Sequence, residues 1–239
     1  MSILALRAPL VTLASMLAVG VATSPDLDAG RLQTGVFRYR TLVEGNEAGE
    51  SRIQVLHHPN SATYAFSNLV TGTFTQSWEA VTTREFAPVS AKLVFGAGPA
   101  ARPSFELAYS SGRVSGFAFS RTEPVTKRPI DQMVPADTVD QRIDWAAVMA
   151  IADVTRGRAF NFHVYDPATQ NSPVSAQVEG TKTTRVPAGT YQTVRVVYRI
   201  EKAGKSETYV VLATPKPPRF MVKEIFPTGA ITELVGIVP

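Results

Sequence analysis

Cysteine is absent from all 239 residues of the chain. This absence excludes disulfides, thiolate metal sites and a cysteine nucleophile. It also excludes the lipid-bearing cysteine that follows the signal segment of a bacterial lipoprotein. A folded domain made from this sequence must therefore be stabilised by burial and hydrogen bonding alone.

Runs of like charge are also absent. The formal net charge is only +4, and the basic residues are spread along the chain. Nucleic acid is therefore not an expected partner. A hydrophobic content of 44% with 18% charged residues is typical of a globular chain that can fill a core.

One uncharged apolar run stands near the start, over residues 8–22, directly after Arg7. It is short for a membrane span, and Gly20 and Ala22 have the spacing that a signal peptidase recognises. We predict a signal peptide over residues 1–22, with an uncleaved anchor as the alternative, and a single domain over 23–239 in the periplasm or outside the cell. No later run approaches about 18 apolar residues, so no membrane span is expected after cleavage.

From Gly35 onward the hydrophobic pattern has a period of two. In "GVFRYRTLV", Phe37 and Tyr39 share one face while Arg38 and Arg40 share the other. About thirteen such stretches follow one another, bounded by Gly, Pro or Ser-Gly. The sequence predicts a mainly all-β fold: an antiparallel meander curved into an open or half barrel.

A sharp turn is predicted at Pro187-Ala188-Gly189, between two alternating stretches. Pro187 fixes φ, and Gly189 can adopt the positive φ that a tight hairpin requires. We therefore interpret these residues as a corner of the sheet and not as a catalytic loop.

Two segments interrupt the alternation. Residues 121–137 contain three prolines and no periodicity, which predicts a long loop. Residues 138–154 have apolar side chains at a spacing of four, from Val139 to Ile151, which predicts one inserted helix that covers an open end of the curved sheet.

The residues that could support catalysis or metal binding form no recognisable motif. His57 and His58 are adjacent and would point to opposite faces of a strand, and His163 with Asp166 lacks a Gly-x-Ser-x-Gly nucleophile elbow. We predict no metal, no cofactor and no catalytic residues. A carboxylate pair drawn from Glu179, Glu207 and Glu224 remains open, because the distances between strands are not visible in the sequence.

Aromatic residues at strand spacing have two interpretations: they fill the core, or they line a concave site for an apolar ligand. The candidate ligand-binding residues are Phe37, Tyr39, Tyr64, Phe66, Trp78, Phe117, Phe119 and Tyr198. Four arginines could form an anion-binding patch if the two strands that carry them are neighbours. The alternative is that these arginines pair with glutamates or are solvated. These are Arg38, Arg40, Arg195 and Arg199.

The stretch "VPAGTYQTVRV", the segment "DWAAVMAIADVTRGRAFNFHVYD" and the final strands together resemble DUF3108, a family of bacterial exported or periplasmic proteins of unknown function. The resemblance runs from about Gly35 to Leu234, and Asp144 and Gly157 match positions of its pattern. Met221-Val222 departs from the Pro-Val pair usual in the family. The resemblance implies an exported, curved, mostly antiparallel sheet, and it supplies no catalytic set.

These observations favour a non-enzymatic envelope protein that binds an apolar or amphipathic, lipid-like ligand in its curved sheet. A second hypothesis is a structural or assembly factor that docks a partner protein through a sheet edge or the 121–137 loop. A hydrolase is the third.

Overall fold

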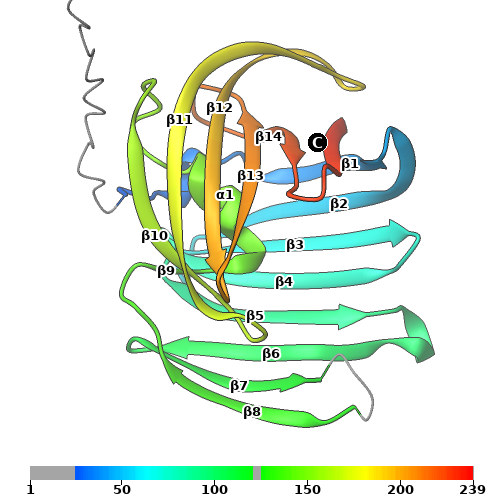
Figure 1. The fold of residues 1–239 in the computed structure, drawn as a ribbon, viewed down its shortest axis with the longest axis vertical. Helices are drawn as coiled ribbons and strands as arrows, with labels where there is room; N and C mark the ends of the chain where they lie inside the picture. The colour runs from blue at the N-terminus through cyan, green and yellow to red at the C-terminus, as the bar shows by residue number, and fades with distance from the viewer. Residues whose placement is uncertain (1–24, 121–124, 239) are drawn as a thin grey trace, which may run out of the picture.

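The computed structural model describes residues 25–120 and 125–238, which form one sheet of 15 strands (Figure 1). The strands are β1 (Gly35–Val43), β2 (Asn46–His58), β3 (Thr63–Gly72), β4 (Gln76–Thr83), β5 (Pro88–Phe95), β6 (Arg102–Ser110), β7 (Arg113–Phe119), β8 (Lys127–Met133), β9 (Thr138–Asp140), β10 (Ala159–Asp166), β11 (Gln170–Val186), β12 (Gly189–Lys202), β13 (Lys205–Ala213), β14 (Met221–Ile225) and β15 (Ile231–Val238).

The sheet has the order β8-β7-β6-β5-β4-β3-β2-β1-β15-β14-β13-β12-β11-β10-β9. The chain runs outward from β1 to β8, continues at the opposite edge with β9, and returns to β1 through β15. Every neighbouring pair is antiparallel except β9 with β10, which is parallel. The predicted antiparallel meander is confirmed, and the sheet is open, with β8 and β9 as its edges.

The two halves of the sheet face each other across a shared core. In Figure 1, the first strands of the β1–β8 half run behind β10–β13, β6–β8 continue the sheet below them, and the helix α1 (Asp144–Met149) lies between the two halves. Phe66 of β3 is fully buried and contacts the edge of Trp145 of α1, with ring centroids 6.3 Å apart. Burying a side chain of this size contributes roughly 1.5–3 kcal/mol, so contacts between the halves maintain the curvature.

The inserted helix is confirmed, but it covers only Asp144–Met149 of the predicted 138–154. Residues Thr138–Asp140 form β9, and a turn of 3-10 helix, Gln141–Ile143, leads into α1. All residues of α1 are buried, so the apolar spacing of this segment reflects burial on every side and not one helical face. No helix within the described ranges is long and apolar enough to cross a membrane.

Arg219 marks the end of α1. Its guanidinium donates hydrogen bonds to the carbonyl oxygens of Met149 and Ile151, at 2.7 and 2.6 Å. Carbonyl groups at a helix end have no partner inside the helix, and a cation there also interacts favourably with the helix dipole. The chain therefore leaves the helix at Ala150.

The predicted loop over 121–137 is wrong in its middle, because Lys127–Met133 form β8. This strand pairs antiparallel with β7, and Pro129 lies opposite Phe117. Proline is tolerated in an edge strand, where one row of backbone groups needs no ladder partner. The prolines therefore mark a sheet edge. Residues 121–124 and the predicted signal peptide, 1–22, lie outside the described residues.

The corner at Pro187 and Ala188 is confirmed. Val186 pairs with Gly189 across the turn, and Gly189 has a φ of 135°. The turn is tied to the sheet because Ala188 N–H donates to the carbonyl oxygen of Leu234 at 3.1 Å, and the Tyr191 hydroxyl donates to the carbonyl oxygen of Ala188 at 3.2 Å.

Replacing Gly189 with alanine should lower the free energy of unfolding by roughly 1–3 kcal/mol, because a side chain strains the backbone at this φ. Urea denaturation followed by circular dichroism measures the effect. Gly236→Ala is the control, because Gly236 does not have a positive φ and an added methyl group would contact only the end of the Arg38 side chain. Equal stability of the two variants would contradict the prediction.

Candidate functional site

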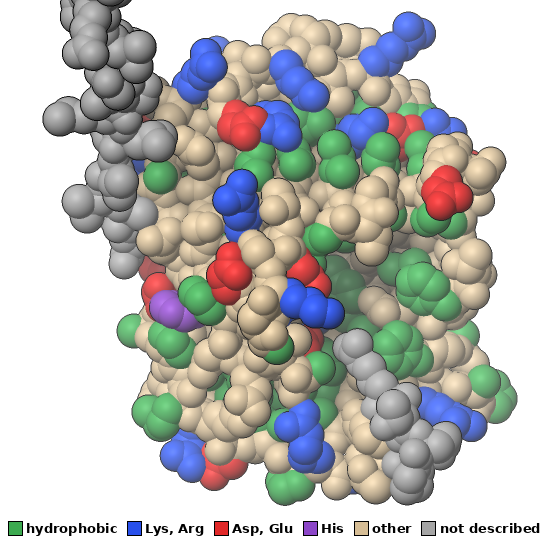
Figure 2. All heavy atoms as spheres, viewed as in Figure 1, with side chains coloured by type: hydrophobic (Ala, Val, Ile, Leu, Met, Phe, Trp, Pro, Cys, Tyr) green, Lys and Arg blue, Asp and Glu red, His purple; other side chains and the backbone are tan. Residues whose placement is uncertain are grey.

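A groove of about 860 Å³ opens between the β1–β5 half of the sheet and the layer formed by α1, β13 and β14. Figure 2 shows this face hollowed, with hydrophobic side chains inside the hollow. The walls are mainly apolar: Ile53, Trp78, Leu93, Trp145 and Met221. Val43, Val70, Phe74, Phe95 and Phe226, on strand ends and turns, also line it.

Two buried carboxyl groups form the acidic floor of the groove, Asp144 and Glu224. Asp144 is the first residue of α1, and Glu224 lies in β14; their exposures are 6% and 5%. Asp144 Oδ1 accepts a hydrogen bond from Trp145 N–H at 2.6 Å, and Glu224 Oε1 accepts one from the Tyr198 hydroxyl at 3.4 Å. The short helix α1 and strand β14 thus bring together acids 80 positions apart in sequence.

Burial controls the protonation of the acidic floor. Desolvation raises the pKa of Asp144 to about 7. It raises the pKa of Glu224 to about 8, and the negative charge of Asp144 contributes to that rise. Neither acid forms an ion pair with any described residue. Around neutral pH Glu224 is therefore mainly protonated while Asp144 exchanges its proton, so the floor can donate hydrogen bonds as well as accept them.

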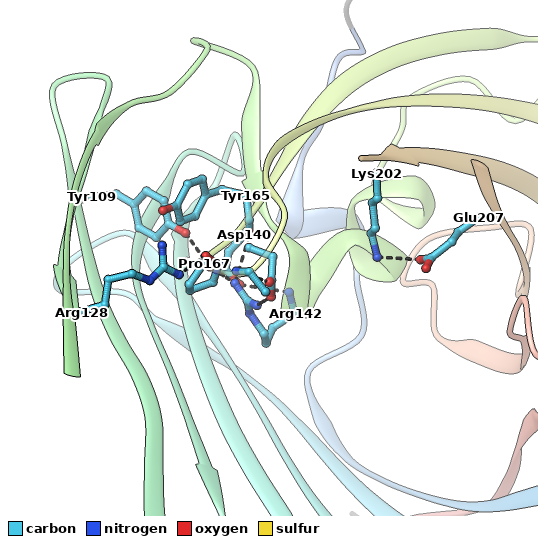
Figure 3. A network of polar contacts seen from close by, with 10 residues as sticks. Tyr109, Arg128, Asp140, Arg142, Tyr165, Pro167, Lys202 and Glu207 are labelled. Carbon is cyan, nitrogen blue, oxygen red and sulfur yellow. Dashed lines mark hydrogen bonds and ion pairs between the residues drawn. The ribbon is translucent and has the colours of Figure 1, made fainter. Parts of the chain in front are cut away.

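The cations nearest the acidic floor are already paired. The side chain of Arg142 is 8% exposed, and its guanidinium donates to Asp140 Oδ2 at 2.8 Å and to Asp166 Oδ2 at 2.6 Å. The Tyr109 hydroxyl donates to Asp140 Oδ2 at 2.6 Å. Figure 3 shows this Arg142 network on one side and the Lys202–Glu207 pair apart from it.

Lys202, at the end of β12, forms an ion pair with Glu207 of the neighbouring strand β13. Its Nζ lies 2.7 Å from Glu207 Oε2, which also accepts a hydrogen bond from the Tyr209 hydroxyl at 2.9 Å. The rings of Tyr209 and Tyr198 stack with centroids 5.0 Å apart. Both bonds to Glu207 help to lower its pKa, so this acid is charged beside the protonated floor.

Of the eight aromatic residues proposed for ligand binding, only Trp78 lines the groove. Phe37, Tyr39, Tyr64, Phe66 and Tyr198 belong to the buried core. Phe117 and Phe119 point away from the face that buries Ala118, and their rings contact each other at 5.7 Å. Four further groove aromatics lie at turns, at strand ends or in the helix, where alternation gives no signal: Phe74, Phe95, Trp145 and Phe226. Tyr209, which lies within β13, also lines the groove.

The four arginines are not brought together. Strands β1 and β12 are separated by β15, β14 and β13. Arg40 instead lies 2.6 Å from a carboxylate oxygen of Glu233, and Arg195 is paired with Glu179. Pairing with glutamates, the alternative, accounts for these two side chains.

The remaining candidates for catalysis are also dispersed. His163 Nδ1 lies 2.8 Å from Asp137 Oδ1, while Asp166 is bonded to Arg142. His57 stacks on Tyr64 with ring centroids 4.6 Å apart. No group of three or more potential metal ligands occurs within the described ranges. Of the three strand glutamates considered as a catalytic pair, Glu207 and Glu224 line the groove, and Glu179 is not among the residues that do.

Comparison with curated proteins found no match. Two crystal structures align with the chain: a provisionally assigned exported protein with a YmcC-like fold from Bacteroides fragilis, 11% identical with a TM-score of 0.39, and a provisionally assigned lipoprotein from Parabacteroides distasonis, 12% identical with a TM-score of 0.33. The first alignment covers 89% of this chain and 100% of the other, and the second covers 90% and 99%.

A family model covers most of the described sheet. The model for DUF3108, described as a protein of unknown function, matches residues 36–234, which run from β1 into β15. These residues include the turn at Pro187, the helix α1 and both acids of the floor. The chain therefore belongs to the DUF3108 family.

Proposed function

We propose that this protein binds an amphipathic, lipid-like molecule in the groove and does so without catalysis. The observation that carries the proposal is the combination of a hollow of about 860 Å³ and mainly apolar walls with a buried acidic floor. Binding sites for small molecules typically have volumes of about 300–1,000 Å³ and a few polar groups among apolar walls. An apolar chain would contact the walls, and a polar head would reach Asp144 and Glu224.

Binding is favoured over hydrolysis by the chemistry of the lining. The His163–Asp137 pair is not part of the groove, and no histidine is among the described residues that line it. The groove acids are buried and close to Tyr198, where they can fix the orientation of a polar group. In the proposed role the signal peptide, 1–22, delivers a single domain, 23–239, to the periplasm or the exterior.

The groove is also favoured over a docking role for the sheet edges. Strand β9 has only three residues, and β8 carries Pro129 and mainly exposed polar side chains. A partner strand would find few consecutive backbone groups to pair with.

Native mass spectrometry of the protein purified from its own cell envelope tests the proposal, because a bound small molecule adds to the mass of the folded chain. Val70→Trp should remove this added mass, since Val70 lines the groove and a larger ring would occupy the space. Leu69→Trp is the matched control. Leu69 is the preceding residue of β3, points to the other face and is 44% exposed.

The expected result is a ligand on the wild type and on Leu69→Trp, and none on Val70→Trp. Equal occupancy in both variants would place the ligand elsewhere. A wild-type protein that carries no ligand and also binds no added amphiphile would overturn the proposal. Circular dichroism of both variants confirms that the fold is retained.

A further inference from the structure

We propose that the ligand of the groove has a cationic head group, an amine, which lies against Asp144 and Glu224. This inference rests on the proposed function and names its ligand class. An amphipathic amine combines an alkyl chain for the apolar walls with an ammonium group for the acidic floor.

The balance of charge at the floor favours a cation. Three acids near the floor already have a cationic partner: Asp140 and Asp166 pair with Arg142, and Glu207 pairs with Lys202. Asp144 and Glu224 form no ion pair with any described residue, and the charges that reach Asp144 through space, those of Lys202 and Arg142, are already paired with other acids. A bound ammonium group would supply the missing charge without breaking an existing pair, whereas a phosphate or carboxylate head would meet only cations that are already neutralised.

An unpartnered oxygen atom points to the same ligand. Glu224 is 5% exposed and lines the groove, yet its Oε2 has no hydrogen bond or ion pair with any described residue. One oxygen of the Glu224 carboxyl group thus accepts a long hydrogen bond from Tyr198, and the other accepts none from a described residue. Oε2 is not one of the fully enclosed polar atoms without a partner, which among the described residues are Thr138 Oγ1 and Thr169 Oγ1, so it is open to the groove, where an ammonium group offers three donors.

Aromatic rings beside the acids add a second contact for a cation. Trp145 directly follows Asp144, and Trp145, Trp78 and Tyr209 all line the groove. The faces of tryptophan and tyrosine rings attract cations, and this attraction grows when water is excluded. An ammonium group at the floor would therefore be surrounded by negative charge and aromatic surface.

Binding of a cation should displace protons from the floor. The groups that face the two acids are Tyr198 and Lys202 of β12, Glu207 and Tyr209 of β13, Arg142 before α1, and Tyr39 of β1. The three tyrosines have raised pKa values because of burial, and Arg142 remains charged, so the two acids are the members of this set that can release a proton near neutral pH. Affinity for an amine should therefore rise with pH, while affinity for an uncharged amphiphile should not.

Tryptophan fluorescence is a direct probe, because the chain has two tryptophans and both line the groove. Decylamine, decanol and decyl sulfate present one chain length with a cationic, neutral or anionic head. Each is titrated below its micelle concentration at about pH 6 and about pH 8, where an alkylammonium group remains charged. We expect decylamine to bind about tenfold or more tightly than decanol at the higher pH, as for a charge-assisted contact, and to lose part of that advantage at the lower pH.

Glu224→Gln should abolish most of the preference for decylamine while decanol still binds. Glu79→Gln is the matched control: it removes the same charge from a side chain that is 43% exposed and adjacent to Trp78 in β4. Equal binding of decylamine and decanol, or tighter binding of decyl sulfate, would overturn the amine assignment and leave a ligand groove in place. Failure of all three probes to change the fluorescence would count against the groove itself.

Discussion

Replacing Arg142 with methionine is expected to lower the free energy of unfolding by about 3–5 kcal/mol, the range found when one partner of a buried ion pair is removed. The guanidinium bonds two acids, Asp140 and Asp166, and its side chain is only 8% exposed. Methionine fills similar space but leaves the fully buried Asp140 without its cation. Urea denaturation, followed by circular dichroism, measures the change.

Arg113→Met is the control for this prediction. Arg113 also bonds an aspartate in two places, but both Arg113 and Asp131 are more than half exposed on β7 and β8. Water screens an exposed pair, so its loss should leave the denaturation midpoint nearly unchanged. A loss as small for Arg142→Met as for Arg113→Met would show that the buried network contributes specificity and not stability.

The Arg142 network also shows what the sequence could predict. The charged members of the network stand where β9, β10 and α1 meet and the alternation ends, so two-residue periodicity carries no signal for them. Tyr109 joins them from β6, in the other half of the sheet. The strands themselves were predictable because each buries one face: in β4, Trp78, Ala80 and Thr82 are buried at every second position. The Pro187 corner was predictable because proline restricts φ and glycine can adopt the positive φ of a tight turn.

The acidic floor was not predictable for a different reason. Glu224 resembles any strand carboxylate, and Asp144 resembles any residue at the start of a helix. Their proximity depends on how the β9–β15 half folds over the β1–β8 half, which no local pattern encodes. The helix over 138–154 was overestimated for a related reason: Val139 and Ile151 are buried by β10 and by the bridge to Leu27, and not by a continuous helical face.

Raising the pH from about 5 to about 8 should lower the free energy of unfolding, because the floor acids hold their protons more tightly in the folded chain. Burial raises the pKa of Asp144 to about 7 and that of Glu224 to about 8. An unfolded chain releases these protons near pH 4, so the folded state binds more protons throughout the window between the unfolded and folded values. Within this window each acid lowers the free energy of unfolding by roughly 1.4 kcal/mol per pH unit. Below the window both states bind the protons and the effect disappears.

Glu224→Gln should remove about half of this slope, because the amide keeps the shape of the protonated acid and cannot ionise. The variant should therefore match the wild type near pH 4 and be more stable than it near pH 8, by roughly 1 kcal/mol or more. Urea denaturation at several pH values measures both curves, and Glu79→Gln should follow the wild type throughout. Parallel curves for Glu224→Gln and the wild type would show that the buried acid is charged in the folded protein at neutral pH. Desolvation would then have to be offset by a contact other than the weak hydrogen bond from Tyr198.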